Sequence, residues 1–344
     1  NIRKDDFMNI CIVGAGNIGT YLATYISMKE GNKVWLHTSK PEVFKEEITL
    51  VEEEKNLRHN VKVHSITSSY EEAVKNADYV LITYPSFMIE ETLKKIIPYL
   101  KEGTVVGVIP GFGGKEYLID ELLEKGCIFF GSQRVPSIIR LEKYGECVLL
   151  KQKNEFMKLR VIPSKYSDKV CEVMTSFIDI PCLPLSNYLA ITLSPSNPTM
   201  HPSRLYELFN DYVEGEKVYP RNPYFYEEWG TLASQTLLDL DDELTEIFNS
   251  LNDNNEFYEE DMEKIKKRYG ISTAKELSEK INTAPGFQGI DSPMVKIEGG
   301  FIPDKNSRYF VEDIQFGLCI IKAFAELCNV ETPTVDKIIE WGQK

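Results

Sequence analysis

One histidine of the chain stands apart from the others and has neighbours that suit proton transfer. The sequence of 344 residues holds four histidines, and only His201 lies beyond residue 64. An imidazole can both accept and donate a proton near neutral pH. Asn197 precedes it by one helical turn, so the two would share one face of a helix or of a Pro-interrupted helical turn. We take His201 as a candidate general acid and base beside Asn197, against the alternative of a histidine that only caps or packs.

A carboxylate that could orient this imidazole occurs at the start of an apolar helical segment further along the chain. Asp313 heads that segment, with Glu312 as the competing acid. A carboxylate partner fixes the tautomer of a histidine and stabilises its cation. Arg308, just upstream, carries the planar guanidinium that can bind a substrate carboxylate with two hydrogen bonds. The alternative for Asp313 is an ordinary acid favoured by the helix dipole.

The glycine pattern of a dinucleotide-binding loop occurs near the N-terminus. Gly14, Gly16 and Gly19 follow an apolar strand and open a helix. In such a loop the first glycine permits the tight turn, the second lets the backbone approach a pyrophosphate, and the third lets helix and strand pack closely. Asn17 and Ile18 lie at the helix N-terminus, whose free N–H groups attract the anion. We therefore predict a nicotinamide dinucleotide cofactor.

The end of the second predicted strand distinguishes between the two nicotinamide cofactors. An NAD site usually places Asp or Glu there, bonded to the ribose 2′-hydroxyl. Here the strand ends in Thr38, Ser39 and Lys40. Hydroxyls and an ammonium suit a 2′-phosphate better, so NADP(H) is favoured over NAD(H). The alternative is that Thr38 and Ser39 only begin the helix that starts at Pro41.

Two later strand ends are predicted to lie at the same edge of the sheet. The strand at residues 79–84 ends at Pro85, over the crevice where the cofactor crosses the sheet, and we include Pro85 in the cofactor site. A Gly-rich run at residues 109–114 ends the next strand. That run either contacts a ligand or only makes a turn.

The pattern of apolar runs predicts two domains. Strands alternate with helices over residues 8–185, a spacing that predicts parallel βαβ units in a doubly wound sheet of the Rossmann type. The predicted strands are 9–13, 33–37, 79–84, 104–109, 127–132, 147–152 and 180–185, and the predicted helices are 18–28, 71–76, 89–100, 115–124 and 168–177. We expect this α/β domain to bind NAD(P).

Helical patterns dominate residues 186–344, where we expect an all-α substrate and catalytic domain. The predicted helices are 187–193, 202–213, 228–248, 259–269, 273–282, 311–328 and 334–340. Residues 239–280 are heavily charged, which is typical of solvated helix faces. A loop rich in Gly and Pro is expected at residues 283–306.

Composition excludes several classes of function. The net charge of −14 argues against binding to nucleic acid or an anionic membrane. No segment approaches the roughly 20 apolar residues of a membrane span, and the seven cysteines lack metal-type spacing and suit reduced thiols. Residues 1–7 are polar and precede Met8, as a leader would. We predict a cytoplasmic protein without a metal, whose partners are small-molecule substrates, with a homodimer as an open expectation.

The motifs of the chain resemble those of the octopine/nopaline (opine) dehydrogenase family over essentially its whole length. The shared features are Gly-Ala-Gly-Asn-Ile-Gly at 14–19, Asn-Pro-x-x-His-Pro-Ser at 197–203, Gly-Phe-Gln-Gly-Ile-Asp-Ser-Pro at 286–293, Arg-Tyr-x-x-Glu-Asp at 308–313, Gly317 and Thr-Pro-Thr at 332–334. The resemblance implies a catalytic His201, Asp313 as its carboxylate partner, Arg308 as a substrate-carboxylate ligand and Asn197 as the active-site amide. It also implies a reaction that reductively joins the amine of an amino acid to an α-keto acid such as pyruvate or 2-oxoglutarate.

In that reaction the amine attacks the keto carbon, His201 moves protons as the carbinolamine loses water, and the imine takes hydride from the nicotinamide. Gln133 and Arg134, at a strand end of the first domain, are candidate ligands for the carboxylate of the second substrate. Arg140 and Arg204 are weaker candidates for this role. Each of these side chains could instead be a surface or interdomain ion-pair residue.

Two other functions remain open at this stage. A simple 2-keto acid or ketone reductase of the ketopantoate or glycerol-3-phosphate type resembles this architecture, but such enzymes use an active-site lysine that residues 197–201 lack. A non-catalytic NADP(H)-binding sensor would bind the cofactor without turnover, and fold alone does not exclude it. The chain departs from the family pattern at residues 38–40 and in the charged residues 253–282.

Overall fold

The chain folds as two separately packed units, which the structure, a computed structural model, describes for residues 8–252 and 261–343. Unit 1 ends at Ile191 and unit 2 begins at Thr192. The boundary predicted between residues 185 and 186 falls a few residues before this division. The predicted polar leader at residues 1–7 lies outside the described residues. In the described part of the chain, no helix is both long and apolar enough to span a membrane.

An eight-stranded sheet forms the centre of unit 1, with the strand order β12-β11-β8-β7-β6-β1-β2-β5. The strands are β1 Met8–Val13, β2 Asn32–His37, β5 Ser65–Thr67, β6 Tyr79–Ile82, β7 Val105–Val108, β8 Ile128–Ser132, β11 Met157–Ile162 and β12 Cys182–Pro184. The six neighbouring strands β5, β2, β1, β6, β7 and β8 pair in parallel. Strand β11 runs antiparallel to β8. Because β2 and β6 flank β1, the strand order reverses at β1, and dinucleotides bind outside the carboxyl ends of the strands at such a point.

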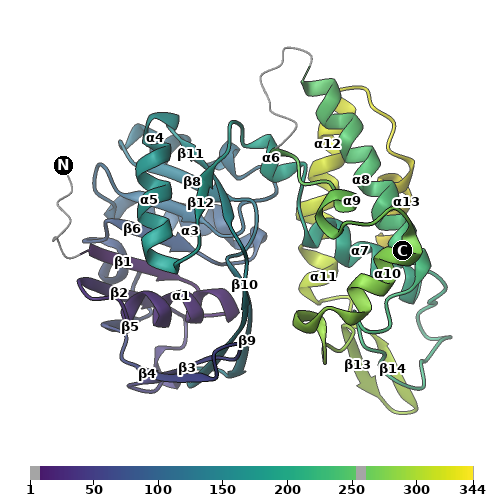
Figure 1. Ribbon diagram of the computed structural model, residues 1–344, viewed down its shortest axis with the longest axis horizontal. Helices are drawn as coiled ribbons and strands as arrows, with labels where there is room; N and C mark the ends of the chain where they lie inside the picture. The colour runs from purple at the N-terminus through teal and green to yellow at the C-terminus, as the bar shows by residue number, and fades with distance from the viewer. Residues whose placement is uncertain (1–7, 253–260, 344) are drawn as a thin grey trace. The chain divides into compact units, whose positions relative to one another are not determined.

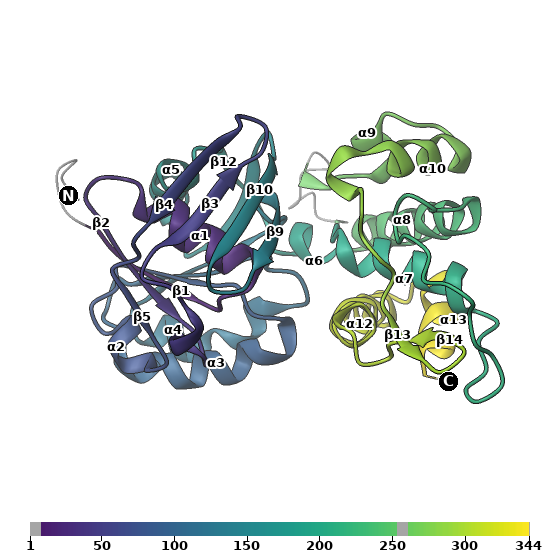
Figure 2. The same ribbon diagram turned by 90° about the horizontal axis from the view of Figure 1, so that it is seen from below.

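Alternate residues of β1 enter two different hydrophobic cores. Ile10 and Ile12 pack with α1 and α5, whereas Cys11 and Val13 pack with α2, α3 and α4. The helices are α1 Asn17–Ser27, α2 Tyr70–Val74, α3 Ile89–Ile96, α4 Asp120–Glu124 and α5 Ser167–Ile178. Figure 2 shows these two sets of helices on opposite sides of the sheet. A strand buried on both faces carries a continuous apolar run, which is why the sequence revealed it.

A second sheet of unit 1, with the order β4-β3-β10-β9, differs from the sequence prediction. Its strands are β3 Ile48–Glu52, β4 Leu57–Val61, β9 Ser137–Lys143 and β10 Cys147–Lys153. The strand predicted at 147–152 was placed in the doubly wound sheet, and this was wrong, because β10 pairs with β9 and β3 instead. The prediction also missed β3, β4, β5, β9 and β11. Buried and partly exposed residues alternate in β3 and β11, so these strands lack a continuous apolar run.

Unit 2 is built from helices and one hairpin (Figure 1). The elements are α7 Asn197–Phe209, α8 Thr231–Leu251, α9 Ile265–Tyr269, α10 Ala274–Thr283, β13 Met294–Ile297, β14 Gly300–Pro303, α11 Arg308–Val311, α12 Cys319–Leu327 and α13 Pro333–Gly342; a short helix α6, Leu189–Thr192, spans the division between the units. The predicted loop at 283–306 was wrong in part, since it contains the β13–β14 hairpin. Part of the helix predicted at 259–269 lies outside the described residues, and the described part is helical only in α9.

Helix α7 begins before the predicted start at residue 202 and continues through two prolines. Pro198 lies in the first turn, where its missing N–H has no helical partner in any case. Pro202 lies inside the helix without ending it. Asn197 and His201 therefore lie one turn apart on a continuous helix rather than on a broken turn.

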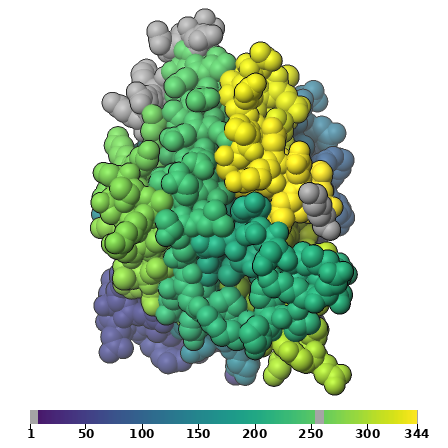
Figure 3. All heavy atoms as spheres, turned by 90° about the vertical axis from the view of Figure 1, so that its right-hand side faces the viewer, coloured from purple at the N-terminus to yellow at the C-terminus, as the bar shows by residue number. Residues whose placement is uncertain are grey.

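The C-terminal helix is held by a carboxylate from α8. Both oxygens of Glu243 accept backbone N–H groups at the start of α13, from Thr334 at 2.7 Å and Val335 at 3.0 Å. A carboxylate at a helix N-terminus satisfies unpaired donors and complements the helix dipole. Helix α13 packs against α8 and α7, and Figure 3 shows the yellow C-terminal segment next to green residues on the surface. Glu243 thus helps to fix the helices that support α7.

Candidate active site

The side chain of His201 has a hydrogen-bond partner at each ring nitrogen. Its Nδ1 lies 2.7 Å from Oδ2 of Asp313, and its Nε2 lies 2.8 Å from the hydroxyl of Tyr226. His201 and Asp313 are both 3% exposed. Because a carboxylate only accepts, Nδ1 carries the proton and Nε2 accepts the tyrosine O–H in the neutral imidazole. Of the two acids considered, Asp313 and not Glu312 makes this contact.

A local widening of the helix places Asp313 next to α7. A π-helical segment, η8 Ile314–Leu318, follows directly after Asp313, and the N–H of Leu318 donates to its carbonyl at 3.0 Å. At Gly317 an added Cβ would lie 2.4 Å from Cβ of Pro198, so α7 and η8 touch without room for a side chain. Single π-turns occur often at functional sites. Gly317 and Pro198 therefore permit the approach that joins Asp313 to His201.

Aromatic rings enclose the imidazole. The ring of Tyr309 stacks on His201 at a centroid distance of 4.0 Å, and Phe225 meets it edge-on at 5.6 Å. The face of an aromatic ring attracts a cation. Together with the Asp313 carboxylate, the Tyr309 ring favours the imidazolium that forms when Nε2 takes a proton. The pair can therefore hold a proton during a reaction.

Tyr226 has no motif in the sequence that marks it as a site residue. It lies in the aromatic run Tyr-Phe-Tyr-Glu-Glu-Trp at residues 224–229, which follows α7 without any fixed spacing to His201. The aromatic run itself was the only available signal, and such runs usually form core. The contact with His201 depends on how the chain turns back after α7, and this is a tertiary feature.

Arg308 lies near an aromatic neighbour of the pair, and Asn197 lies one helical turn before His201. Arg308 is exposed at the start of α11, and its guanidinium carbon lies 5.8 Å from the ring centroid of Tyr309, the ring that stacks on His201. Asn197 is the first residue of α7, one turn before His201, and it is half-buried. The exposed guanidinium can bind a substrate carboxylate next to the ring of Tyr309.

The glycine loop has the three properties that a dinucleotide requires. Gly14 has a φ of +103°, and an added Cβ would lie 2.9 Å from Oγ1 of Thr83. At Gly19 an added Cβ would lie 1.7 Å from the carbonyl oxygen of Gly14, so this glycine allows α1 to touch the loop. At Gly16 nothing lies within 4 Å, so the protein itself does not require a glycine there. The open space at Gly16 is a cradle that fits a pyrophosphate.

The N-terminus of α1 is uncapped and lacks acidic residues in its first turn. The backbone N–H groups of Asn17 and Ile18 belong to this turn, where a helix offers donors and a positive dipole end to an anion. The side chain of Asn17 has another task, since its Oδ1 accepts the N–H of Leu141 at 2.7 Å and ties α1 to β9. The amide oxygen of Asn17 is therefore occupied within the protein, and its backbone N–H lies in the turn that faces an anion.

The residues predicted at the end of β2 differ in exposure. Thr38 is buried, and its hydroxyl lies 3.1 Å from that of Tyr144 and accepts the N–H of Lys40 at 3.3 Å. Ser39 and Lys40 are exposed. Pro85 lies beyond the carboxyl end of β6, beside β1, as the cofactor edge requires. Within residues 38–40, the exposed Ser39 and Lys40 are better placed for a ligand than Thr38.

A buried histidine, His37, packs at the carboxyl end of β2. His37, the last residue of β2, stacks on Tyr70 at a centroid distance of 3.8 Å, and its Nδ1 lies 3.3 Å from the hydroxyl of Tyr84. Its Nε2 lies 3.2 Å from the carbonyl of Ser68. Burial lowers the pKa of His37. The neutral ring therefore orients Tyr84, whose side chain in turn borders Gly14.

Three of the four other predicted polar ligands donate to backbone carbonyls of the protein. The amide nitrogen of Gln133, after β8, donates to the carbonyl of Ala190 at 2.9 Å, and Arg134 beside it is half-buried. Arg140 donates to the carbonyl of Ile139 at 2.9 Å. Arg204 is buried and donates to two backbone carbonyls after α7. Arg204 and Arg140 are therefore positioned as structural groups, whereas Gln133 and Arg134 lie at a carboxyl strand end.

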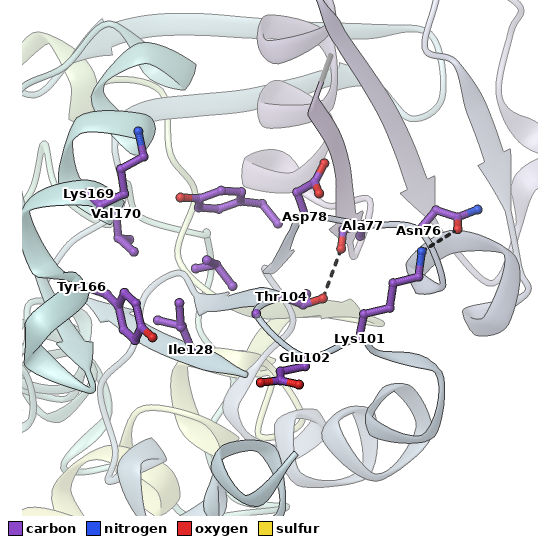
Figure 4. A pocket seen from close by; sticks show the side chains of 13 residues that line it. Asn76, Ala77, Asp78, Lys101, Glu102, Thr104, Ile128, Tyr166, Lys169 and Val170 are labelled. Atoms are coloured by element: carbon purple, nitrogen blue, oxygen red, sulfur yellow. Dashed lines mark hydrogen bonds between the residues drawn. The ribbon is translucent and has the colours of Figure 1, made fainter. Parts of the chain in front are cut away.

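A hollow of about 650 Å³ lies at the amino ends of the strands of the eight-stranded sheet, whereas the glycine loop follows the carboxyl end of β1 (Figure 4). It is lined by residues before or at the amino ends of β6, β7 and β8, including Asp78, Thr104 and Ile128. Lys101 donates to Asn76 at 3.0 Å on its rim. Dinucleotides bind at carboxyl strand ends, so this hollow is not the cofactor site.

One carboxyl group near the cofactor edge is poorly solvated. Glu116 lies in the short helix η4, Lys115–Leu118, which follows the Gly-rich loop after β7, and its Oε2 is buried without a hydrogen-bond partner. Burial raises the pKa of Glu116 to about 7, against smaller opposing effects of a hydrogen bond from its own backbone N–H and of the Lys115 charge. The folded protein therefore holds a proton that the unfolded chain releases nearer pH 4.5, and stability is lost as pH rises through this window.

The variant Glu116→Gln is expected to raise Tm by a few degrees at pH 8 and to change it little at pH 5, since each pKa unit corresponds to about 1.4 kcal/mol. The physical reason is that glutamine stays uncharged at both pH values. Thermal unfolding followed by circular dichroism would measure this, with the exposed Glu121→Gln as control. An equal shift at both pH values would show that ionisation of Glu116 is not the cause.

Comparisons with known proteins agree with these two units. Residues 184–344 match the family model for the NAD/NADP octopine/nopaline dehydrogenase α-helical domain, and residues 10–149 match that for ketopantoate reductase PanE/ApbA. A tauropine dehydrogenase from Arabella iricolor is 29% identical over 296 residues, which cover 81% of this chain and 74% of that protein.

Solved structures show the same fold. Octopine dehydrogenase in complex with NADH and agmatine superposes with a TM-score of 0.82 at 21% identity, over 98% of this chain and 89% of that one. A yersinopine dehydrogenase with bound NADP+ superposes with a TM-score of 0.70 at 16% identity, over 98% of this chain and 90% of that one. The predicted α/β fold, a Rossmann-type domain followed by a helical domain, is confirmed. With its nucleotide-binding loop, the chain is an NAD(P)-dependent oxidoreductase whose helical unit matches the octopine/nopaline dehydrogenase α-helical domain and which is similar over most of its length to opine dehydrogenases.

Proposed function

We propose that this protein reductively condenses the amine of an amino acid with an α-keto acid of the pyruvate or 2-oxoglutarate class. The observation that carries the proposal is the buried His201–Asp313 pair, joined at 2.7 Å beside an exposed Arg308. Octopine dehydrogenase structures that contain L-arginine or pyruvate together with NADH support this choice of substrate classes. The ketopantoate reductase match ends at residue 149, before the helical unit, and so says nothing about the residues of unit 2.

Each residue of the site has a distinct task in this reaction. Asp313 keeps Nδ1 of His201 protonated, so that Nε2 takes the proton that the substrate ammonium must lose before its nitrogen attacks the keto carbon. After the attack, an N–H proton passes to the oxygen to give the carbinolamine. The imidazolium then gives up a proton toward the carbinolamine hydroxyl, and the C–O bond breaks to release water. Arg308 binds the keto-acid carboxylate, and Asn197 supplies an amide on the same face of α7. When bound, the nicotinamide supplies the hydride that reduces the resulting imine.

The cofactor proposal is NADPH in preference to NADH. The open cradle at Gly16 and the uncapped N-terminus of α1 fit the pyrophosphate of either dinucleotide. Exposed Ser39 and Lys40 support the 2′-phosphate, because no carboxylate follows β2 before Glu42. Gln133 and Arg134 are proposed for the carboxylate of the second substrate, at a strand end on the carboxyl edge.

The proposal is tested by following oxidation of NADPH and of NADH with pairs of amino acids and α-keto acids. We expect turnover only when both substrates are present, and a higher kcat/KM with NADPH. Each substrate alone serves as the control. Oxidation with a keto acid alone would instead identify a simple ketone reductase, and tight cofactor binding without turnover for any pair would identify a sensor.

A further inference from the structure

The imidazole of His201 reaches its surroundings only through another side chain. Its Nδ1 is bound to Asp313, and its Nε2 accepts the hydroxyl of Tyr226 at 2.8 Å. One ring face is covered by Tyr309, and the side chain is 4% exposed. A proton that enters or leaves Nε2 in this arrangement must therefore pass through the Tyr226 oxygen, or Tyr226 must first move away.

The packing of Tyr226 opposes such a movement. Its ring stacks on Phe287 at a centroid distance of 4.3 Å and an angle of 15°, and it lies parallel to Trp229 at 6.1 Å and 4°. Phe225 meets it edge-on at 4.8 Å. Tyr226 is only 5% exposed, and rotation would break three ring contacts, each worth about 0.5–1.5 kcal/mol beyond area burial.

The backbone on the N-terminal side of Tyr226 is held from α7 itself. Arg204 lies one turn after His201, and its guanidinium donates to the carbonyls of Phe225 at 2.9 Å and Tyr224 at 3.2 Å. It is 4% exposed and also pairs with Glu207, whose carboxylate accepts the N–H of Gly230 at 2.9 Å. A buried guanidinium is tolerated only when its donors are satisfied. The helix that carries the imidazole thus also fixes the segment that carries the phenol.

We propose that Tyr226 is the catalytic residue that exchanges protons directly with the substrate, and that His201 acts behind it. The inference rests on the proposed function. When the substrate ammonium loses its proton, the Tyr226 oxygen takes that proton and gives its own to Nε2, forming an imidazolium next to Asp313. When the carbinolamine loses water, Nε2 returns a proton to the Tyr226 oxygen, which protonates the leaving hydroxyl as the C–O bond breaks and the nitrogen lone pair forms C=N. The relay thus carries one proton from the ammonium to the leaving water, whose other proton passes from nitrogen to oxygen when the carbinolamine forms. The product is an iminium ion, and the phenol is regenerated.

Arg204 is a positioning residue in this scheme. It touches neither the imidazole nor, by our proposal, the reacting atoms, but it holds the carbonyls of the two residues before Tyr226. Its replacement should therefore lower kcat through Tyr226 and leave the substrate KM values nearly unchanged. A structural role alone would lower stability without this selectivity.

The main test is the variant Tyr226→Phe, which removes the hydroxyl and keeps the ring packing against Phe287 and Trp229. We expect kcat for the reductive condensation to fall roughly 10²-fold with NADPH affinity unchanged. Tm should fall by a few degrees at most, because Nε2 of His201 loses a buried donor. Tyr212→Phe, at a half-buried tyrosine of the same unit, is the matched control and should keep wild-type kcat. The wild type should give a curved dependence of kcat on deuterium fraction in mixed water, because two protons move together, whereas Tyr226→Phe should give a straight line.

A second measurement does not depend on turnover. In apo protein labelled with ¹⁵N-histidine, Tyr226→Phe should shift the Nε2 resonance of His201 and leave its Nδ1 proton bonded to Asp313. In addition, Arg204→Lys should lower kcat in the wild type and cause no further loss in the Tyr226→Phe background.

The outcomes separate this inference from the proposed function. If the wild type turns over no pair of amino acid and keto acid, the proposed function fails, whatever the histidine spectra show. If the wild type is active and Tyr226→Phe keeps its kcat and its curved deuterium dependence, the relay is overturned and the proposed function stands.

Discussion

The variant His201→Asn is expected to lower kcat for the reductive condensation by roughly 10²–10⁴-fold, the range typical of a lost general acid–base group. Asparagine can still bond to Asp313 or Tyr226, but it does not take up a proton near neutral pH. The dinucleotide loop lies in the other unit, so the affinity for NADPH should not change. Steady-state kinetics with a productive substrate pair, together with titration of NADPH fluorescence, would measure both quantities.

The matched control is His64→Asn, because His64 is an exposed histidine of unit 1, whereas His201 lies in unit 2. It should keep wild-type kcat and NADPH affinity. Wild-type kcat in His201→Asn would make the imidazole a structural group, and the mechanism proposed above would then be wrong.

The variant Gly19→Ala is expected to unfold or strongly destabilise unit 1. Its added Cβ would lie 1.7 Å from the carbonyl oxygen of Gly14, and backbone cannot rotate out of the way as a flexible side chain can. A backbone displacement of this kind belongs to the severe class of single mutations, roughly 3–5 kcal/mol. Thermal unfolding should show a Tm lower by about 10 °C, and NADPH binding should be lost.

Gly16→Ala is the informative partner of this variant. No atom lies within 4 Å of the added Cβ, so Tm should stay near the wild-type value. The methyl group would, however, occupy the space assigned to the pyrophosphate, and NADPH affinity should fall. A Gly16→Ala variant with wild-type affinity would show that the cofactor does not use this cradle.

The sequence predicted those parts of the fold whose burial is uniform. Strands β1, β6 and β7 are covered on both faces by helices, so their residues are continuously apolar and were recognised. In the second sheet, β3 was missed because buried and half-buried residues alternate in it, and β4 because most of its residues are exposed. Strand β10 was recognised but assigned to the wrong sheet, because pairing partners depend on tertiary structure. The β13–β14 hairpin carries mostly exposed or half-buried residues and reads as loop.

In the active site, the sequence predicted residues from their chemistry but not from their packing. His201 and Asp313 were paired from their chemistry although 112 residues separate them. Tyr226 carries no such mark, since a tyrosine in an aromatic run is typical of a hydrophobic core. Thr38 was predicted as a ligand from its type and position, yet its hydroxyl is bonded to Tyr144 inside the protein. Residue types predict which groups can react, and only the packed chain determines which of them are available.

The contact between Gly317 and Pro198 means that the geometry of the His201–Asp313 pair depends on side-chain volume as well as on charge. The distance between α7 and η8 sets the length of the bond between His201 and Asp313, and that distance is limited by two residues that carry no titratable group. A larger side chain at either position would separate the dyad like a wedge while leaving every ionisable residue in place. Natural or engineered relatives could therefore retune proton transfer through steric substitutions alone.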